Sequence, residues 1–175
     1  MKKIIALSFL LWGAAAVAQP AVMVGHAGHA ADPASHSSHG QGRPAPDAPV
    51  SRTLSVSGCW IRAVPVPAPS AGYFVVRNSG ASDAKLTGAS SEAFGMVMLH
   101  QTTDHDGMSK MSMAHDILIP AGKELVFKPN GYHAMLEQPV KALEIGTDIS
   151  LEFMFDTGEK ATAACRVMPA NTVSK

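Results

Sequence analysis

The chain has 175 residues, of which 46% are hydrophobic, and it carries 14 basic and 14 acidic side chains. A chain without an excess of positive charge lacks the field that would hold nucleic acid phosphates or anionic lipid headgroups. Nucleic acid is therefore not an expected partner, whereas a metal ion or another protein is.

The first 18 residues have the composition of a secretory signal. Lys2 and Lys3 precede an apolar run, and Ala16-Val17-Ala18 supplies the small residues of a cleavage site. The run is too short for a membrane span, and no later segment has the roughly 18 unbroken apolar residues that a span requires. Removing residues 1–18 would leave 12 basic against 14 acidic side chains. We therefore expect an exported protein with no membrane span in its mature form, and a bacterial periplasm as its compartment.

Residues 19–50 are rich in Gly, Ala, Ser, Pro and His, and few of their side chains could form a core. This composition predicts a disordered tail. The tail holds four histidines, spaced three apart within each pair, which are His26, His29, His36 and His39. Imidazoles on a flexible chain can bind Cu(II), Zn(II) or Ni(II). The tail is thus either a weak metal-capturing segment or a polar linker that contains histidine by chance.

Residues 51–171 change to short runs of alternating polarity separated by turn residues. This pattern predicts one all-β domain, an antiparallel sandwich or barrel. The period of two is clearest in residues 148–155, where every second side chain is a large apolar one. The expected strands cover residues 54–62, 71–78, 84–89, 94–102, 110–118, 123–127, 132–138, 148–155 and 159–168.

Half of the ten methionines lie between residues 96 and 116. We interpret residues 94–118 as an antiparallel hairpin in which His100 faces Met111. In this register the histidines and methionines of both strands lie on the same face of the sheet. The further pairs in this register are Met98 with Met113 and Met96 with His115. Because a strand alternates its faces, the residues expected to point outward are Met96, Met98 and His100, and those expected to face the core are Gly95, Val97 and Leu99. An exposed methionine cluster needs a metal or a partner surface to explain it.

A third pair of donors follows at His133 and Met135. On a strand these two side chains project from the same face, roughly 6.6 Å apart along the chain. Thioethers are soft, neutral donors that select Cu(I), whereas zinc prefers Cys, His or carboxylate ligands. Methionine also forms no disulfide, so it stays available where thiols are oxidised. A site of two imidazoles and two thioethers therefore predicts Cu(I) binding.

The remaining donors of this region have ordinary explanations beside the metal hypothesis. Surface or gap-filling roles account for three methionines as well as an auxiliary metal role does, and these are Met96, Met98 and Met113. His105 and Met108 fall in the expected hairpin loop, where a solvated histidine is the simpler interpretation. His115 is either an ordinary surface histidine or an auxiliary ligand.

The spacing of the four donors is specific. His100 is followed by ten residues, Met111, twenty-one residues, and then His133, one residue and Met135. This motif resembles that of the PCuAC copper chaperones of the periplasm, without insertion or deletion. The resemblance covers about residues 53–169, and further matching segments are Trp60-Ile61-Arg62-Ala63, Gly72-Tyr73-Phe74, Asn78, Pro120-Ala121-Gly122 and the run from Pro129 to Leu136.

The resemblance implies a cupredoxin-like β-barrel that binds one Cu(I) through His100, Met111, His133 and Met135. It also implies delivery of copper to the dinuclear centre of cytochrome c oxidase subunit II, often alongside Sco-type proteins. Several members of that family carry a His- and Met-rich extension at the carboxyl end, whereas here the histidines precede the domain.

Cys59 and Cys165 fall in the first and last expected strands, which are often neighbours in sandwich folds. An even number of cysteines in an exported protein suggests a disulfide. Strand alternation places Cys165 inward and Cys59 on the opposite face, so a disulfide would require a β-bulge. No Cys-x-x-Cys motif is present for thiol exchange.

The alternatives to a copper carrier differ in class. A blue-copper electron-transfer protein needs a Cys thiolate, two His and an axial Met, and here no histidine follows Cys165. A copper buffer or resistance protein would share the site but donate to no acceptor. An enzyme is not expected, because we find no arrangement of nucleophile, base and orienting residue.

Overall fold

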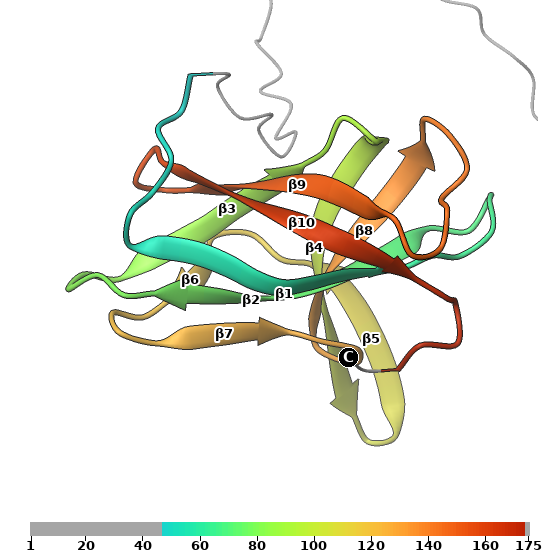
Figure 1. Cartoon of the computed structure of the whole chain (residues 1–175). Helices are drawn as coiled ribbons and strands as arrows, with labels where there is room; N and C mark the ends of the chain where they lie inside the picture. The colour runs from blue at the N-terminus through green and yellow to red at the C-terminus, as the bar shows by residue number, and fades with distance from the viewer. Residues whose placement is uncertain (1–46, 174–175) are drawn as a thin grey trace, which may run out of the picture. The chain divides into compact units, whose positions relative to one another are not determined.

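The computed structural model describes residues 47–173, which form the β-domain drawn in Figure 1. Among these residues there are ten strands and no helix, in agreement with the predicted all-β class. The strands are β1 (Leu54–Arg62), β2 (Ser70–Asn78), β3 (Ala84–Ser90), β4 (Phe94–His105), β5 (Met108–Met113), β6 (Ile117–Ile119), β7 (Glu124–Phe127), β8 (Tyr132–Pro139), β9 (Asp148–Phe155) and β10 (Lys160–Met168).

One expected strand is two strands in the structure. The segment predicted as 110–118 ends as β5 at Met113 and resumes as β6 at Ile117. Asp116 has a positive φ of 48°, which breaks the extended backbone. Ala114 is buried, and its N–H donates to the carbonyl oxygen of Leu99 at 2.9 Å. The chain thus leaves the methionine hairpin at this point and crosses to pair with β3.

The strands form a single sheet in the order β5-β4-β8-β2-β1-β10-β9-β3-β6, with β7 paired to β2. The antiparallel arrangement predicted from the sequence holds for every strand pair among the described residues except β1 with β10, which is parallel. The sheet is therefore mixed. Because β1 and β10 are neighbours, the first and last strands lie side by side, as expected (Figure 1).

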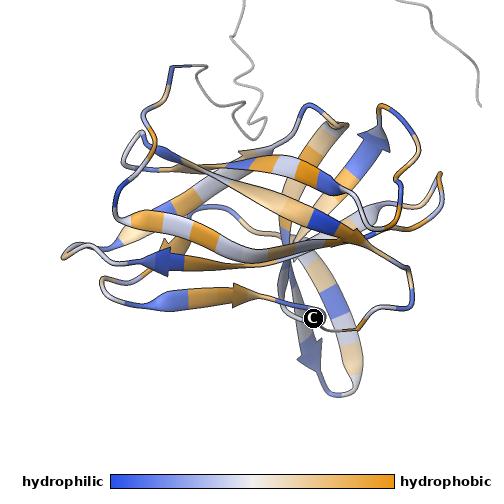
Figure 2. Cartoon of the chain, in the orientation of Figure 1, coloured by the Kyte–Doolittle hydropathy of each residue, from blue (hydrophilic) through white to orange (hydrophobic). Residues whose placement is uncertain are grey.

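The core follows from strand alternation. In β10, and in β9 from Leu151 onward, every second residue is buried. In Figure 2, orange and white bands alternate in hydropathy along the first part of β1. Three phenylalanines lie at the centre, with Phe74 stacked on Phe127 at 4.2 Å and tilted against Phe153 at 4.5 Å between ring centroids. Each large side chain buried in this way contributes about 1.5–3 kcal/mol of transfer free energy.

A β-bulge in β1 positions Cys59 for a disulfide with Cys165. The pairing of β1 with β2 shifts register between Ser57 and Trp60, where Gly58 has a φ of 61° that glycine adopts without strain. The bulge turns Cys59 toward the core. There it forms a disulfide with Cys165, and both residues are buried.

Backbone pairing begins slightly before the predicted domain boundary at residue 51. Val50 forms a parallel bridge with Lys160, whose N–H donates to the carbonyl oxygen of Pro49 at 2.9 Å. Residues 49 and 50, which the sequence places in the tail, thus contact β10. No helix within residues 47–173 has the length and apolar character needed to cross a membrane.

Candidate metal centre

Three adjacent strands, β5, β4 and β8, collect the predicted donors on one face. Directly opposed residues of antiparallel strands point to the same side of the sheet. Across β4 and β8, His100 is opposite His133 and Met98 is opposite Met135. Across β4 and β5, His100 is opposite Met113 and Thr102 is opposite Met111. All four predicted ligands therefore share one face of the sheet, together with Met98 and Met113.

This face lies opposite the core. Leu99 and Ala134, which are adjacent in sequence to the two histidines, belong to the core cluster on the other side. Val97 also faces the core as predicted, but Gly95 is exposed. His100 lies on the face away from the core, as predicted, but it is only 7% exposed. The side chain of His100 thus points away from the core, yet surrounding residues shield it from solvent.

The two histidines form a buried pair at the centre of the face. His133 is 9% exposed, and its ring lies 5.9 Å from the ring of His100, centroid to centroid, at an interplanar angle of 27°. The Nδ1 atom of His133 lies 3.0 Å from the carbonyl oxygen of Gly131. Because a carbonyl only accepts, Nδ1 must donate, and the lone pair of Nε2 is left for a metal.

His100 is the unpartnered member of the pair. Its Nδ1 atom is buried and has no hydrogen-bond partner among residues 47–173. Most buried polar atoms are hydrogen-bonded, so an orphan of this kind calls for a ligand, an ion or a water. A metal ion bound to the pair would satisfy it.

Burial lowers the pKa of the His100 imidazole below its ordinary value, and the neighbouring His133 and His115 lower it further, whereas Glu137 raises it. A lowered pKa keeps the imidazole neutral near pH 7. Only neutral imidazole can coordinate a metal. The site therefore holds this donor in the protonation state that metal binding requires.

The predicted register of the methionine hairpin is wrong by two residues. His100 faces Met113 and not Met111, and Met96 faces Glu137 of β8 and not His115. The signal that fixes the register is Asp106-Gly107, where both residues have positive φ, 50° and 77°. Such a pair forms the type I′ turn of a two-residue hairpin, which sets His105 opposite Met108. The phase of the donors is unchanged, since a shift of two keeps each side chain on its face.

The thioethers differ in how much solvent they meet. Met111 and Met113 on β5 are 51% and 46% exposed, whereas Met98 and Met135 are half-buried. Every residue of β5 is exposed, and in Figure 1 the β4–β5 hairpin extends away from the rest of the sheet. Met111 is thus carried on an edge strand that contacts only β4 in the strand order.

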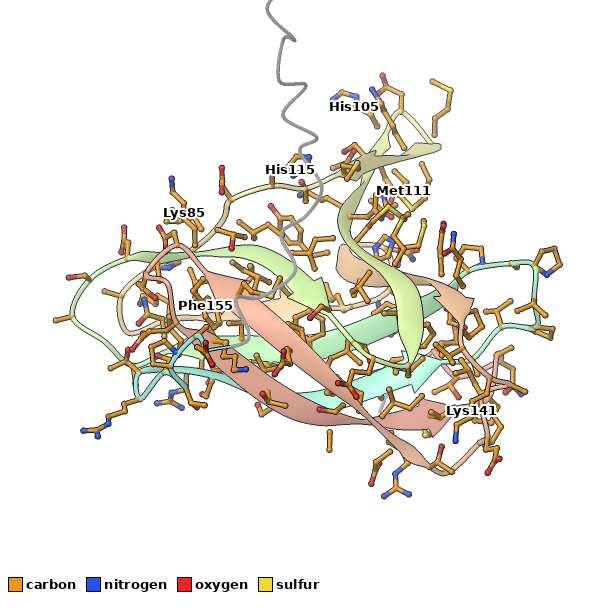
Figure 3. The ribbon with its side chains drawn as sticks, turned by 90° about the horizontal axis from the view of Figure 1, so that it is seen from above. Lys85, His105, Met111, His115, Lys141 and Phe155 are labelled. Carbon is orange, nitrogen blue, oxygen red and sulfur yellow. A yellow bond between two sulfur atoms is a disulfide. The ribbon has the colours of Figure 1, made fainter. Side chains whose placement is uncertain are left out.

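The other histidines and methionine of this region lie elsewhere. His105 and Met108 are opposed to each other, one residue out of phase with the donor face, so they point to the other side of the hairpin. Figure 3 shows His105 at the tip of the hairpin, Met111 nearer the body, and His115 in the segment that follows. His115 belongs to no strand.

An aromatic wall borders the site, and the sequence interpretation did not include it. Trp60 and Tyr73 are opposite each other on β1 and β2, 4.5 Å apart between centroids, and Tyr73 lies 6.5 Å from the ring of His133. The two aromatic residues are buried although they lie outside the core cluster. The guanidinium of Arg62 lies 5.4 Å above the Tyr73 ring. The sequence did contain one indication of this wall. Tyr73 is adjacent to the core residue Phe74 on the same strand, so its side chain must lie on the opposite face.

The remaining sequence predictions divide into two groups. His26, His29, His36 and His39 lie outside the described residues, as does the predicted signal segment. Cys165 is held in the disulfide on the core side of the sheet, so its thiolate is not available to a blue-copper centre. Residues 47–173 contain no group of three or more His, Cys, Asp and Glu side chains able to hold a metal. The donors that share a face with His100 and His133 are the thioethers of Met98, Met111, Met113 and Met135.

The fold and this donor set define a small all-β domain with a candidate site of neutral imidazole and thioether ligands. Residues 54–167 match the family described as putative lipoprotein LpqE-like, and the chain belongs to this family. It is similar to the putative lipoprotein Lxx21020 of Leifsonia xyli subsp. xyli, with 33% identity over 115 residues that cover 65% of this chain and 69% of the relative. It is also similar to the uncharacterized protein RP573 of Rickettsia prowazekii, with 30% identity over 107 residues, 61% of this chain and 59% of that protein.

Solved structures agree on the fold. The apo PmoF2 PCuAC domain superimposes with a TM-score of 0.56 at 20% identity, covering 70% of this chain and 95% of that one. The copper-bound PCuAC domain from PmoF2 gives 0.56 at 20% identity, covering 67% and 93%. The solution structure of CuI-DR1885 from Deinococcus radiodurans gives 0.53 at 27% identity, covering 71% and 81%. The cupredoxin-like fold implied by the PCuAC resemblance is thus confirmed.

Proposed function

We propose that this protein is a Cu(I) carrier that binds one ion through His100, Met111, His133 and Met135. The observation that carries the proposal is the buried histidine pair on the thioether face, with His100 Nδ1 lacking a partner and His133 oriented by Gly131. The similarity to CuI-DR1885 at 27% identity supports copper as the ion.

The chemistry of the donors favours the monovalent ion. Thioether sulfur is soft and uncharged, and imidazole nitrogen is neutral when it coordinates, so the site adds no negative charge to stabilise a divalent cation. Thioethers do not form disulfides, which keeps the site open in an oxidising compartment. The Cys59–Cys165 disulfide fits the same environment.

The geometry suits a site that gives up its ion. Two donors are buried histidines, whereas Met111 is half-exposed on an edge strand at the rim of the sheet. An acceptor can approach from the exposed side and replace one thioether at a time. Ligand exchange of this kind requires no unfolding of the domain, because the histidines remain held by β4 and β8.

We further propose that the protein acts in the periplasm, after removal of residues 1–18, and that its acceptor is the dinuclear copper site of cytochrome c oxidase subunit II. A Sco-type protein is the partner expected in the same step. These assignments rest on the signal-like amino terminus and on the PCuAC motif. We propose that the four histidines of residues 19–50 capture Cu(II) before the site formed by His100, Met111, His133 and Met135 is loaded.

Transfer of copper tests the carrier function. The protein is loaded with one equivalent of Cu(I), mixed with the apo copper domain of subunit II, separated from it, and both are assayed for copper. A carrier loses its copper to the acceptor, and a His133→Ala variant brings none because it does not load. Retention of copper in the presence of excess acceptor would instead identify a buffer that sequesters the ion.

A further inference from the structure

We propose that Met98 is a copper-binding residue that exchanges with Met111 as the fourth ligand. The inference rests on the proposed Cu(I) function of the same face. It adds to the four-donor motif a residue whose position in the sheet, and not its sequence spacing, gives it access to the ion.

The ladder places Met98 at the corner of a compact square. The other corners are His100, His133 and Met135, because His100 opposes His133 and Met98 opposes Met135. Opposed Cβ atoms lie about 5 Å apart, and same-face neighbours along a strand about 6.7 Å apart. Each corner is then about 4 Å from the centre in the plane of the sheet. A methionine side chain extends far enough to reach an ion at that centre.

Met111 starts much farther away. It opposes Thr102, so it lies one strand and one row beyond His100, on the side opposite Met135. On a flat ladder its Cβ is about 12 Å from the centre of the square. Twist and bending of the β4–β5 hairpin must bring it in. The exposed edge strand β5 permits such bending, since only β4 pairs with it.

Burial distinguishes Met98 from its neighbour on the same strand and face. Met98 is half-buried among the donors, whereas Met96 opposes Glu137, outside the square, and is 42% exposed. Met96 is therefore the matched control for Met98. Both are methionines of β4, and only one borders the histidine pair.

The ion is bound by four ligands in each of two states. His100, His133 and Met135 are common to both states, and the fourth ligand is either Met111 or Met98. With Met111 bound, the hairpin is folded over the ion, and with Met98 bound, the hairpin is free to lift. The ion keeps two imidazoles and two thioethers in each state. Met98 thus holds the copper while the Met111 side opens to a ligand from the acceptor, and no electron or proton is transferred.

A double-mutant cycle tests the exchange. Met98→Leu, Met111→Leu and the double variant are compared with wild type by competition with a Cu(I) chelator, and thermal unfolding verifies the fold, which leucine preserves by volume. If the thioethers substitute for each other, the double variant loses at least about tenfold more affinity than the product of the single losses. The Met96→Leu/Met111→Leu variant binds like Met111→Leu. Additive losses, or a Met98→Leu variant that behaves as wild type in both backgrounds, would overturn the proposal.

Methyl NMR gives a second, direct observation. In the Met111→Leu protein labelled with ¹³C-methyl methionine, one equivalent of Cu(I) shifts the Met98 methyl signal and leaves that of Met96 in place. An unshifted Met98 signal, while Met135 shifts, refutes the Met98 assignment alone. Failure of the wild-type protein to bind Cu(I) at all refutes the proposed function as well, so the two failures are distinguishable.

Discussion

The disulfide between Cys59 and Cys165 closes nearly the whole domain and should dominate its stability. The cysteines are 106 residues apart, and the bulge at Gly58 brings them together between the first and last strands. We consider the Cys59→Ala/Cys165→Ala variant, which removes the covalent link and leaves two small apolar side chains at buried positions.

The magnitude follows from the length of the closed loop. In the chain-entropy model a cross-link over 106 residues lowers the entropy of the unfolded chain enough to stabilise the fold by about 4.8 kcal/mol at 25 °C. Removing two buried sulfur atoms adds a smaller packing cost of the same sign. Natural domains of this size have only about 5–15 kcal/mol of unfolding free energy, so the variant should be marginally stable.

Guanidinium unfolding, followed by the fluorescence of Trp60, measures the effect. With a slope of about 4 kcal/mol per molar, the midpoint should fall by roughly 1 M. Cu(I) affinity of the folded variant should be unchanged, because both cysteines lie on the core side of the sheet. A midpoint equal to that of the wild type would refute the loop-closure argument, and loss of Cu(I) binding by a folded variant would point to a thiolate ligand.

Three further predictions concern the metal face. Met135→Leu should keep the fold and weaken Cu(I) binding at least about tenfold in a chelator competition, because even loss of a group that only orients a metal ligand costs about 10–100-fold in affinity. Met154→Leu on β9 should bind as the wild type, and equal affinities of the two variants would refute the ligand assignment. Because the pKa of His100 is lowered in the folded chain, the unfolded chain takes up its proton at higher pH, so the unfolding free energy of the metal-free protein should fall as pH drops below about 6.5. Denaturation of a His100→Leu variant should show a smaller fall, and an identical pH profile would contradict the argument. Cu(I) should also change the emission of Trp60, whose strand is two away from that of His133, in a fluorescence titration, and an unchanged spectrum on saturation would show that the ion binds elsewhere.

Strand positions were predictable where polarity alternation and turn residues agree. The bounds of β1 and β9 match their predicted ranges. Residues 148–155 alternate cleanly in polarity, whereas residues 54–62 do so only up to the bulge at Gly58. The break between β5 and β6 was missed. The alternation of polar and apolar residues gives no indication of a break within residues 110–118. The positive φ that interrupts the extended backbone falls on Asp116, and an aspartate marks such a position less clearly than a glycine does.

The shared face of the candidate donors was predictable from the sequence, whereas their pairing and burial were not. Side chains alternate between the two faces of a strand, so the sequence alone indicates which donors lie on the same face. The register depends on the turn, and the turn pair Asp106-Gly107 determines it, whereas the spacing of the methionines does not. Burial of His100 and the aromatic wall of Trp60 and Tyr73 depend on contacts among strands distant in sequence, which no local pattern contains.

X-ray absorption at the copper edge tests the central claim most directly. The protein loaded with one equivalent of Cu(I) should show a first shell of two nitrogen and two sulfur scatterers, with the edge of a monovalent ion and no thiolate. A shell of nitrogen and oxygen alone, or copper that remains unbound at equal concentrations, would contradict the account.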